Sequence, residues 1–467
     1  MTERRRELVF GAVVLGLLVA GLGVDVAGNP VAAPEEIVES RPETFEERAL
    51  FCPPSLKGSR TRLVLGTPSD ASVPVTIQPT IPDPVEIPGR GVLFHSADDG
   101  GPRTVVGFGA PVAAGVITRF TGPIQGIGAA RCARQASDSW YFAQGTSAIG
   151  FDERLLVYNP FPDEAVVRVT FYTDKGTISR ANLSDLAVPA GRATKIKVND
   201  FVFRRRVLGA RVTAVRGRVV AWRALFSEPE NRSPGVDFSI GARGPEEVWY
   251  FPEGAVGPGV VERIAVLNPS DSEATVNISL VTGQEVVQPR ALSNFVVPAG
   301  TTQSLQLPGR LRGSKGKVVR ASAIVRSTNG VPIVTERTVG YDAAGVNGTA
   351  STVGAPASAE SWFVGPATMR ADTDSVIVMN PGSDDATVSI SLVREEGDAV
   401  EPAALEDIEV PAGLRVQISI LEWTEGKPMS ALLEASGPVV AERFSYSKKA
   451  KDVAATIGTP LTPISPE

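Results

Sequence analysis

"VLNPSDSEATVNISLV" occupies residues 266–281, and the chain contains nearly the same phrase twice more. Residues 157–172 read "VYNPFPDEAVVRVTFY" and residues 378–393 read "VMNPGSDDATVSISLV". After each Asn-Pro pair, apolar and polar residues alternate, which is the period of a strand with one face in a core and the other in water. Asn and Pro favour tight turns and interrupt strand pairing. The phrase therefore predicts a strand-turn-strand element that the chain uses three times.

Other landmarks recur in the same order and at the same spacing. The Asn-Pro pairs begin at 159, 268 and 380, the Pro-Ala-Gly triplets begin at 189, 298 and 411, and Trp140, Trp249 and Trp362 open the units. Every interval is between 109 and 113 residues. Such a period is too long for a solenoid repeat and matches an immunoglobulin-like sandwich of about seven strands and about 100 residues. Residues 318–339, "VVRASAIVRSTNGVPIVTERTV", add a predicted hairpin across Asn329-Gly330.

A fourth, degenerate copy precedes these three. Residues 62–77, "RLVLGTPSDASVPVTI", have Thr67-Pro68 in place of Asn-Pro, and "GIGA" at 126–129 stands as the closing phrase. The abundance of Val, Thr, Gly and Pro also favours β-structure. The sequence thus predicts an all-β ectodomain, a string of four tandem immunoglobulin-like modules of which the first is degenerate. Their expected ranges are 50–135, 136–243, 244–358 and 359–467.

The N-terminus has a different composition. Three arginines precede an apolar run from Leu8 to Val24, which predicts a cytoplasmic tip and a transmembrane helix over residues 1–26. Arginines on this side place the rest of the chain outside, as a single-pass membrane protein. Residues 27–49, rich in Pro and Glu, are expected to form a linker. The alternative is a cleaved signal peptide and a secreted protein.

Cys52 and Cys132 are the two cysteines of the chain. An even count in an exported chain predicts one disulfide, which would tie together the ends of the first module. Closing a loop of this length stabilises a fold by roughly 4 to 5 kcal/mol in the chain-entropy estimate. The alternative is two free buried thiols.

Motifs for catalysis are missing from the sequence. His95 is the only histidine, so a histidine-based triad or a His-rich metal site has no set of partners, and His95 is expected in a loop or at the surface. No nucleophile-elbow, phosphate-loop or dinucleotide motif occurs. The expectation is a protein that is not an enzyme, with no cofactor and no metal. The net charge of −6 gives no indication of nucleic acid as a partner.

One stretch is strongly basic. Residues 203–219, "FRRRVLGARVTAVRGRV", contain six arginines: Arg204, Arg205, Arg206, Arg211, Arg216 and Arg218. Clustered guanidinium groups favour contact with an anionic envelope polymer or with lipid headgroups. The alternative is a solvated sheet edge whose charges discourage aggregation.

Arginine also recurs at one position of a later strand. In the three clear modules it is accompanied by an acid six residues before the turn asparagine. We therefore predict three ion pairs, each within one module: Arg223 with Glu153, Arg337 with Glu262, and Arg443 with Asp374. The alternatives are that the arginines lie over a neighbouring tryptophan or point to water.

The repeated Asn-Pro phrase, the later Val-Pro-Ala-Gly and the closing "VVAERF" at 439–444, behind an N-terminal anchor, resemble an actinobacterial cell-envelope family of unknown function. The resemblance covers about residues 50–460 and implies an actinobacterial source and an envelope location. It implies no activity and carries over no catalytic residue.

These observations favour a non-enzymatic, membrane-anchored extracytoplasmic scaffold or docking protein of the cell envelope. Its partner would be an envelope protein or an anionic or glycan polymer. The alternative function is a carbohydrate- or glycopolymer-binding accessory to an envelope glycan assembly machine. A hydrolase, whose carboxylates would come from distant strands, is the third and least favoured class.

Overall fold

The structure, a computed structural model, describes residues 48–461 except 99, 123, 229–234, 312–314, 344, 369 and 395–398. The chain divides into two compact units, residues 1–43 and 44–467. The predicted anchor and nearly all of the predicted linker lie outside the described residues; the first strand, β1 (Ala49–Cys52), begins at the last residue assigned to that linker. Within the described part, no helix is long and apolar enough to cross a membrane.

The unit 44–467 is built from antiparallel strands, and the helices in its described part are single turns. Module 1 continues with β2 (Ser59–Gly66), β3 (Val73–Gln78), β4 (Ile81–Ile87), β5 (Val92–Ser96), β6 (Arg103–Gly107), β7 (Ala113–Thr121) and β8 (Gln125–Arg131). Module 2 contains β9 (Ser139–Phe142), β10 (Phe151–Tyr158), β11 (Ala165–Thr173), β12 (Gly176–Ser179), η1 (Ala181–Leu183), β13 (Leu186–Val188), β14 (Ala193–Lys197), η2 (Val198–Asp200), β15 (Gly209–Arg216), β16 (Val220–Ser227) and β17 (Gly235–Ile240).

The last two modules follow the same plan. Module 3 contains β18 (Val248–Phe251), β19 (Ala255–Val256), β20 (Val260–Asn268), β21 (Ala274–Val281), β22 (Val286–Val287), η3 (Arg290–Leu292), β23 (Phe295–Val297), β24 (Thr301–Gln306), β25 (Val319–Arg320), β26 (Ser322–Ser327), β27 (Val334–Ala343) and β28 (Val346–Val353). Module 4 contains β29 (Ala359–Val364), β30 (Thr373–Met379), β31 (Ala386–Val393), η4 (Ala403–Leu405), β32 (Ile408–Val410), β33 (Arg415–Ser419), α3 (Leu421–Thr424), β34 (Ser430–Ser447), β35 (Asp452–Ile457) and β36 (Thr459–Pro460). The expected module boundaries fall in the connections between β8 and β9, β17 and β18, and β28 and β29.

The modules share two antiparallel sheets with one strand order; module 3 adds the pair β19-β25, and in module 4 the long β34 belongs to both sheets. In module 2 a flanking sheet runs β9-β15-β11-β12 and an axial sheet runs β14-β10-β16-β17. The degenerate module 1 repeats this order as β1-β6-β3-β4 and β5-β2-β7-β8. The predicted alternation is present: Val276, Ile278 and Leu280 of β21 are buried, whereas the residues between them are half-exposed.

The strand order differs from the immunoglobulin arrangement. In immunoglobulin constant domains the first two strands belong to one sheet, in the order ABED. Here the first strand of module 2, β9, pairs with β15, and the second, β10, lies in the other sheet. The all-β prediction is therefore confirmed, while the immunoglobulin-like description of the modules is not. The predicted hairpin at Asn329-Gly330 is wrong, because β26 and β27 belong to different sheets.

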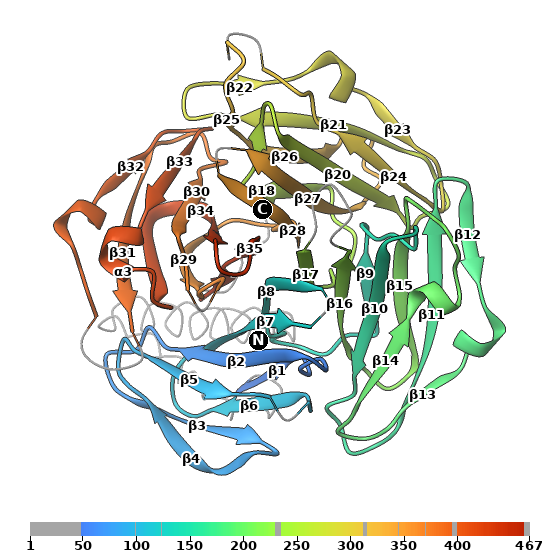
Figure 1. Cartoon of the computed structure of the whole chain (residues 1–467), viewed down its shortest axis with the longest axis horizontal. Helices are drawn as coiled ribbons and strands as arrows, with labels where there is room; N and C mark the ends of the chain where they lie inside the picture. Colours follow the sequence, from blue (N-terminus) through green and yellow to red (C-terminus); the bar gives the residue numbers. More distant parts are fainter. Residues whose placement is uncertain are drawn as a thin grey trace, which may run out of the picture. The chain divides into compact units, whose positions relative to one another are not determined.

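The four modules pack around a common centre, which a string of modules does not do. The last strand of each axial sheet lies nearest that centre, and β8, β17, β28 and β35 pack on one another (Figure 1). The ring is closed by a shared apolar cluster in which Val64 and Phe94 of module 1 pack with Phe363 and Leu432 of module 4. The expectation of a linear string is therefore wrong, because each module buries apolar surface against two neighbours.

The recurring Asn-Pro and Pro-Ala-Gly motifs contact each other. The buried Asn268 amide donates to Ser272 O at 2.7 Å and to Val297 O, just before Pro-Ala-Gly, at 3.0 Å. Asn159 and Asn380 make the same two contacts in their modules. The motifs recur together because one amide joins both turns, and the triplet ends at Gly300, whose φ of 64° suits glycine.

The last strand of module 1 aligns with those of the other modules in a different register from the one that the sequence phrases suggest. The chain crosses back to the first strand at Ala133, which bridges Phe51, as Ala242 bridges Tyr141 in module 2. The equivalent of Gly235 at the start of β17 is therefore Gly126, so "GIGA" opens the central strand and does not close the module. Module 2 ends in "SIGA" at residues 239–242, and its equivalent in module 1 is residues 130–133, "ARCA".

One carboxylate lies where the four central strands begin. The fully buried Asp452 accepts hydrogen bonds from the backbone N–H groups of Ile127, Val236 and Thr349, at 3.1, 3.0 and 3.0 Å, and from that of Val453 at 2.9 Å. Each module thus donates one N–H. The three other modules have glycine at the equivalent position, and a Cβ there would clash with Asp452. Asp452 therefore joins all four modules through one side chain.

We expect Asp452→Asn to destabilise the unit by about 2–5 kcal/mol, because an amide N–H₂ would face backbone donors that need an acceptor. Burial raises the pKa of Asp452 well above its usual value while the four N–H groups oppose the shift, so the variant also removes a group that titrates. Denaturant unfolding of Asp452→Asn and of the exposed control Asp271→Asn measures the effect. Equal midpoints for the two variants would contradict it.

Candidate functional site

Three fully buried arginines form ion pairs in two different ways. Arg443 pairs with Asp374 of its own module, with Nε–Oδ1 at 2.8 Å and Nη2–Oδ2 at 2.6 Å, so this predicted pair is present. The fork geometry and the Ser445 hydroxyl, which donates to Asp374 Oδ1 at 2.8 Å, satisfy the carboxylate.

Arg223 and Arg337 pair with acids other than the ones predicted for them. Arg223 contacts Glu336 of module 3 at 2.5 Å and Asp237 of its own module at 2.8 Å. Arg337 contacts Glu442 of module 4 at 2.7 Å. The predicted pairs Arg223–Glu153 and Arg337–Glu262 are therefore wrong. The physical reason is that the modules close into a ring. Glu336 and Glu442 each stand directly before the arginine of their own module, and each lies across the boundary from the arginine of the preceding module. Breaking such a buried pair costs about 3–5 kcal/mol.

Arg443 pairs within its own module because of the residue that module 1 has at the shared boundary. At the position of Glu336 and Glu442, module 1 has Gly115, which pairs with Arg131 as Glu336 pairs with Val353. Arg443, in the module that precedes module 1 around the ring, thus has no carboxylate across its boundary and binds Asp374.

Glu153 and Glu262 hold loops in place. Glu153 accepts the Thr146 N–H at 2.6 Å, and Glu262 accepts the Ala255 N–H at 2.8 Å. Both carboxyls are buried. Burial raises the pKa of Glu153 to about 8, against the opposing charge of Arg223, and burial raises the pKa of Glu262 to about 8, against Arg337. The loop that Glu153 fixes belongs to the site described next.

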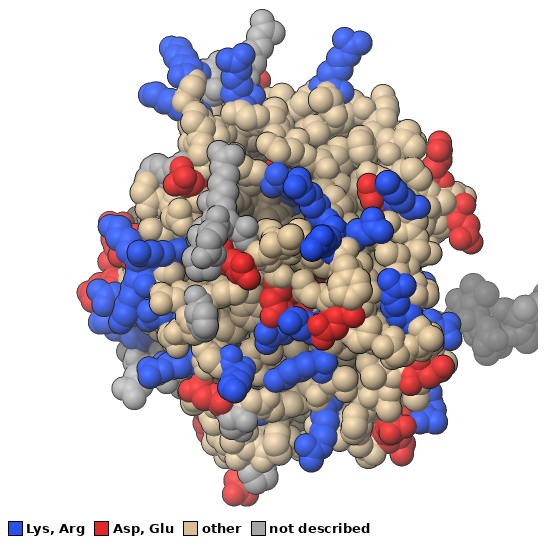
Figure 2. All heavy atoms as spheres, turned by 45° about the vertical axis from the view of Figure 1, so that its right-hand side comes forward, with Lys and Arg blue, Asp and Glu red and all other residues tan. Residues whose placement is uncertain are grey.

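A groove of about 850 Å³ lies between modules 2 and 3. Its module 2 wall includes Arg204, Arg206 and the exposed Ile149, and its module 3 wall includes Arg263 of β20. Asp237 also lines the groove, and its charge is offset by Arg223 at 2.8 Å. Three guanidinium groups, from two modules, therefore line the groove. Figure 2, in which the module 2 side comes forward, shows basic side chains spread over this face with acidic ones between them.

The basic loop of module 2 is held rigidly. Arg204 N–H donates to Ser147 O at 3.1 Å, and Ser147 N–H donates to Arg205 O at 2.8 Å. The Thr146 hydroxyl also donates to Arg205 O, at 2.9 Å. Glu153 also binds the Thr146 N–H. The loop at Thr146 and the loop at Arg204 are therefore held together, and the arginine side chains stay exposed.

The remaining arginines of the basic stretch lie elsewhere. Arg205 is exposed beside the groove without lining it. Arg211 lies over the Tyr141 ring at 5.0 Å from the centroid, and Arg218 lies over that of Phe161 at 5.0 Å. Arg216 pairs with Glu164 at 3.0 Å. The structure therefore brings together Arg204 and Arg206 of the six predicted contacts, and adds Arg263 from another module.

Hydroxyl groups cover much of the remaining wall. Thr146, Ser227, Ser304, Thr338 and Ser351 line the groove, and Thr338 and Ser351 are hydrogen-bonded at 2.9 Å. Guanidinium groups and hydroxyls in one lining suit a ligand that carries both anionic groups and hydroxyls. The module 3 wall of the groove was not predicted from the sequence. Its polar residues are isolated positions of β20 and β27, and in a single sandwich they look like ordinary solvent-exposed residues.

Comparisons place the chain in a family. A family model whose description is Family of unknown function (DUF5719) matches residues 103–355 and 331–441. The chain belongs to this family. The predicted resemblance to a family of unknown function is thus confirmed, while its actinobacterial and envelope implications remain predictions. No curated protein matches the chain.

Solved structures match short parts of the chain. One described as "Crystal Structure of Thermotoga maritima 1070" is 20% identical and aligns over 22% of this chain and 95% of its own length, with a TM-score of 0.20. "Anabaena sensory rhodopsin transducer" is 22% identical over 20% of this chain and 94% of its own, with a TM-score of 0.16. In the described part of the chain, no group of three or more His, Cys, Asp or Glu residues is placed to hold a metal ion.

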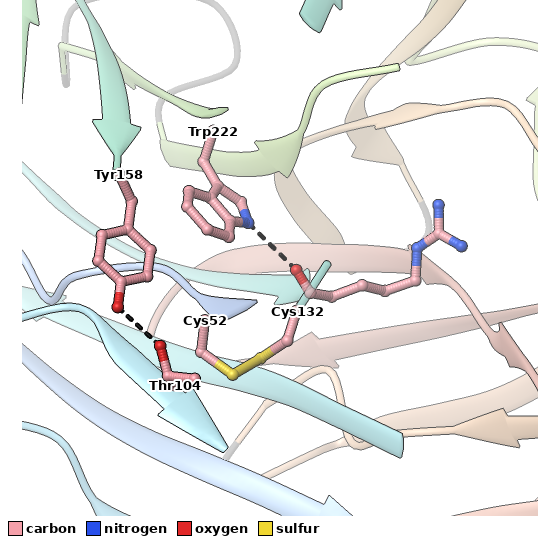
Figure 3. The surroundings of a disulfide bond; sticks show 6 residues. Cys52, Thr104, Cys132, Tyr158 and Trp222 are labelled. Atoms are coloured by element: carbon pink, nitrogen blue, oxygen red, sulfur yellow. Dashed lines mark hydrogen bonds between the residues drawn. A yellow bond between two sulfur atoms is a disulfide. The ribbon is translucent and has the colours of Figure 1, made fainter. Parts of the chain in front are cut away.

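The predicted disulfide between Cys52 and Cys132 is present, with a sequence separation of 80 (Figure 3). At the equivalent place in module 2, the Phe142 ring packs so closely on Gly241 that a Cβ would not fit. The disulfide thus replaces a ring-on-glycine contact. Beside it, the Tyr158 and Thr104 hydroxyls are 2.7 Å apart and Trp222 Nε1 donates to Arg131 O at 3.1 Å, so the bridge lies where modules 1 and 2 meet.

We expect the unfolding free energy to fall as pH rises from about 5 to about 8. The folded state keeps protons on Glu153 and Glu262 up to a pKa of about 8, whereas the unfolded chain loses them near the ordinary value of 4.5. The folded state therefore binds more protons in this window, and each such group lowers stability by up to about 1.4 kcal/mol per pH unit.

The double variant Glu153→Gln/Glu262→Gln should flatten this dependence, because a neutral amide replaces the protonated acids. Glu164→Gln, at an exposed pair, is the matched control. Denaturant unfolding at several pH values gives the slopes. A double variant with the wild-type slope would refute the assignment of the raised pKa values to these two groups.

Proposed function

We propose that the chain is a non-enzymatic docking protein of the cell envelope. Residues 1–26 would anchor it in the membrane, the four modules would lie outside, and the groove between modules 2 and 3 would bind an anionic, hydroxyl-bearing envelope polymer. The observation that carries this proposal is the convergence of Arg204, Arg206 and Arg263, from two modules, on one hydroxyl-lined groove.

The charge balance of the groove supports an anionic ligand. Asp237 is an acidic residue of the wall, and Arg223 binds it from the buried side. The arginines of the basic loop are exposed, and hydrogen bonds hold the loop backbone, so little backbone entropy is lost when they bind. A repeating polyanion would meet several guanidinium groups at once, which adds charge-assisted hydrogen bonds.

A glycan-binding accessory role is the second candidate. The hydroxyl-lined wall favours it, because sugar hydroxyls exchange hydrogen bonds with Ser and Thr. Sugar rings also stack on exposed aromatics, and here Trp140, Trp222, Trp249 and Trp362 are buried while Trp423 is half-buried. Phe203, beside the basic loop, is exposed. The anionic polymer therefore receives more support than a neutral glycan.

The test is binding of the full-length chain to a glycerol-phosphate polymer, with neutral dextran as the alternative ligand. We expect binding to the phosphate polymer that weakens as salt rises from about 50 to about 300 mM. Charge reversal in Arg204→Glu/Arg206→Glu should lower affinity at least about tenfold, because attraction becomes repulsion in the groove.

Arg216→Glu is the matched control, since Arg216 comes from the same basic stretch but lies outside the groove. It should change affinity less than about twofold. Equal losses in the groove variant and the control would mean that only the general charge of module 2 matters and would contradict the site. Tighter binding to dextran would favour the glycan-binding alternative.

A further inference from the structure

A second cavity, of about 730 Å³, lies on the central axis at the other end of the strands from Asp452. Asp452 and its glycine equivalents begin the four central strands, whereas the cavity forms where β8 and β17 end, at Arg131 and Ile240. Its volume is within the range of small-molecule sites, about 300–1,000 Å³. The Asp452 side chain therefore fills the space between the central strands at one end, and the cavity lies at the other end.

The lining of this cavity departs from the repeat. Arg131 lines it from module 1, where Ile240 and Val353 stand in modules 2 and 3. Three residues further on, modules 1 and 2 have Arg134 and Arg243. The corresponding lining residues of modules 3 and 4 are Pro356 and Pro460. The arginines thus come from modules 1 and 2 and the prolines from modules 3 and 4, an asymmetry that packing of four similar repeats does not require; Glu246 is an acid in the same lining.

The three guanidinium groups bond to neutral acceptors. Arg131 donates to Gly458 O at 3.1 Å, Arg134 donates to Pro460 O at 3.2 Å, and Arg243 donates to Gln135 Oε1. Within the described part of the chain, none of the three forms an ion pair with an acid. Burial, and then the charge of Arg243, lowers the pKa of Arg131 to about 10, which leaves Arg131 protonated at neutral pH. The cluster is therefore cationic, and the acids near it are Glu246, which also lines the cavity, and Glu442, whose charge partly opposes the lowering of the pKa of Arg131.

We propose that this axial cavity binds a small amphiphilic anion. Its phosphate or carboxylate head lies between Arg131, Arg134 and Arg243, and its apolar part lies against Val353, Pro356 and Leu461. Arginine binds both kinds of head in bidentate fashion, and an anion there replaces like-charge repulsion with attraction. The apolar wall adds burial of hydrocarbon, worth about 0.8 kcal/mol per CH₂ group in water-to-apolar transfer. The site is separate from the groove between modules 2 and 3.

The experiment is calorimetric titration of the full-length chain with hexyl phosphate, hexanoate, inorganic phosphate and hexanol. Hexyl phosphate should bind one to one, and hexanoate should compete for the same site. Inorganic phosphate and hexanol should each bind at least about tenfold more weakly, because each supplies half of the contacts. Equal affinity for hexyl phosphate and either half-ligand would overturn the proposal, as would no binding of hexyl phosphate.

The decisive variant is Arg131→Ile, which gives module 1 the residue that module 2 has at this place and is therefore expected to fold. It should weaken hexyl phosphate binding at least about tenfold. Arg243→Gln, at an exposed position, should weaken it in the same direction. The groove variant Arg204→Glu/Arg206→Glu should leave hexyl phosphate binding unchanged, which separates this site from the proposed function. Wild-type affinity in both Arg131→Ile and Arg243→Gln would overturn the assignment.

Discussion

The carboxylate of Asp452 is the constraint on which the rest of the fold depends. It accepts one backbone N–H from each of the four modules, so its position fixes the start of every central strand. Three modules keep glycine at that position because the fourth supplies the only side chain for which there is room. Once the strands are fixed in this way, each module lies against two neighbours. The ion pairs Arg223–Glu336 and Arg337–Glu442 then bridge successive boundaries.

The candidate sites occur where the repeats differ. Modules 2 and 3 enclose the groove because module 2 carries a basic loop that Glu153 and Thr146 hold in place. The axial cavity is cationic on one side because module 1 carries Arg131 where modules 2 and 3 have Ile240 and Val353. A chain with four similar repeats keeps the framework in each copy and can vary single positions, so one scaffold carries two different arginine-lined cavities.

Local patterns in the sequence predicted some features within one module. The alternation in β21 and the Cys52–Cys132 disulfide depend on residues of a single repeat and were predicted, whereas the hairpin at Asn329-Gly330 was not formed. Contacts between modules were not predictable in this way. Glu336 and Glu442 look like ordinary strand residues until the ring brings them to the arginines of the preceding modules. The same limit explains why Arg263 was missed, since its partners in the groove are about 60 residues away in another module.

Small-angle X-ray scattering of residues 44–467 tests most directly whether the four modules close into a ring. A compact chain of this length has a radius of gyration of about 22 Å. We expect that value, with a single maximum in the distance distribution. A linear string of four modules would instead give a radius approaching about twice this value, with a long tail in the distance distribution. That result would contradict the ring and the role of Asp452 at its centre.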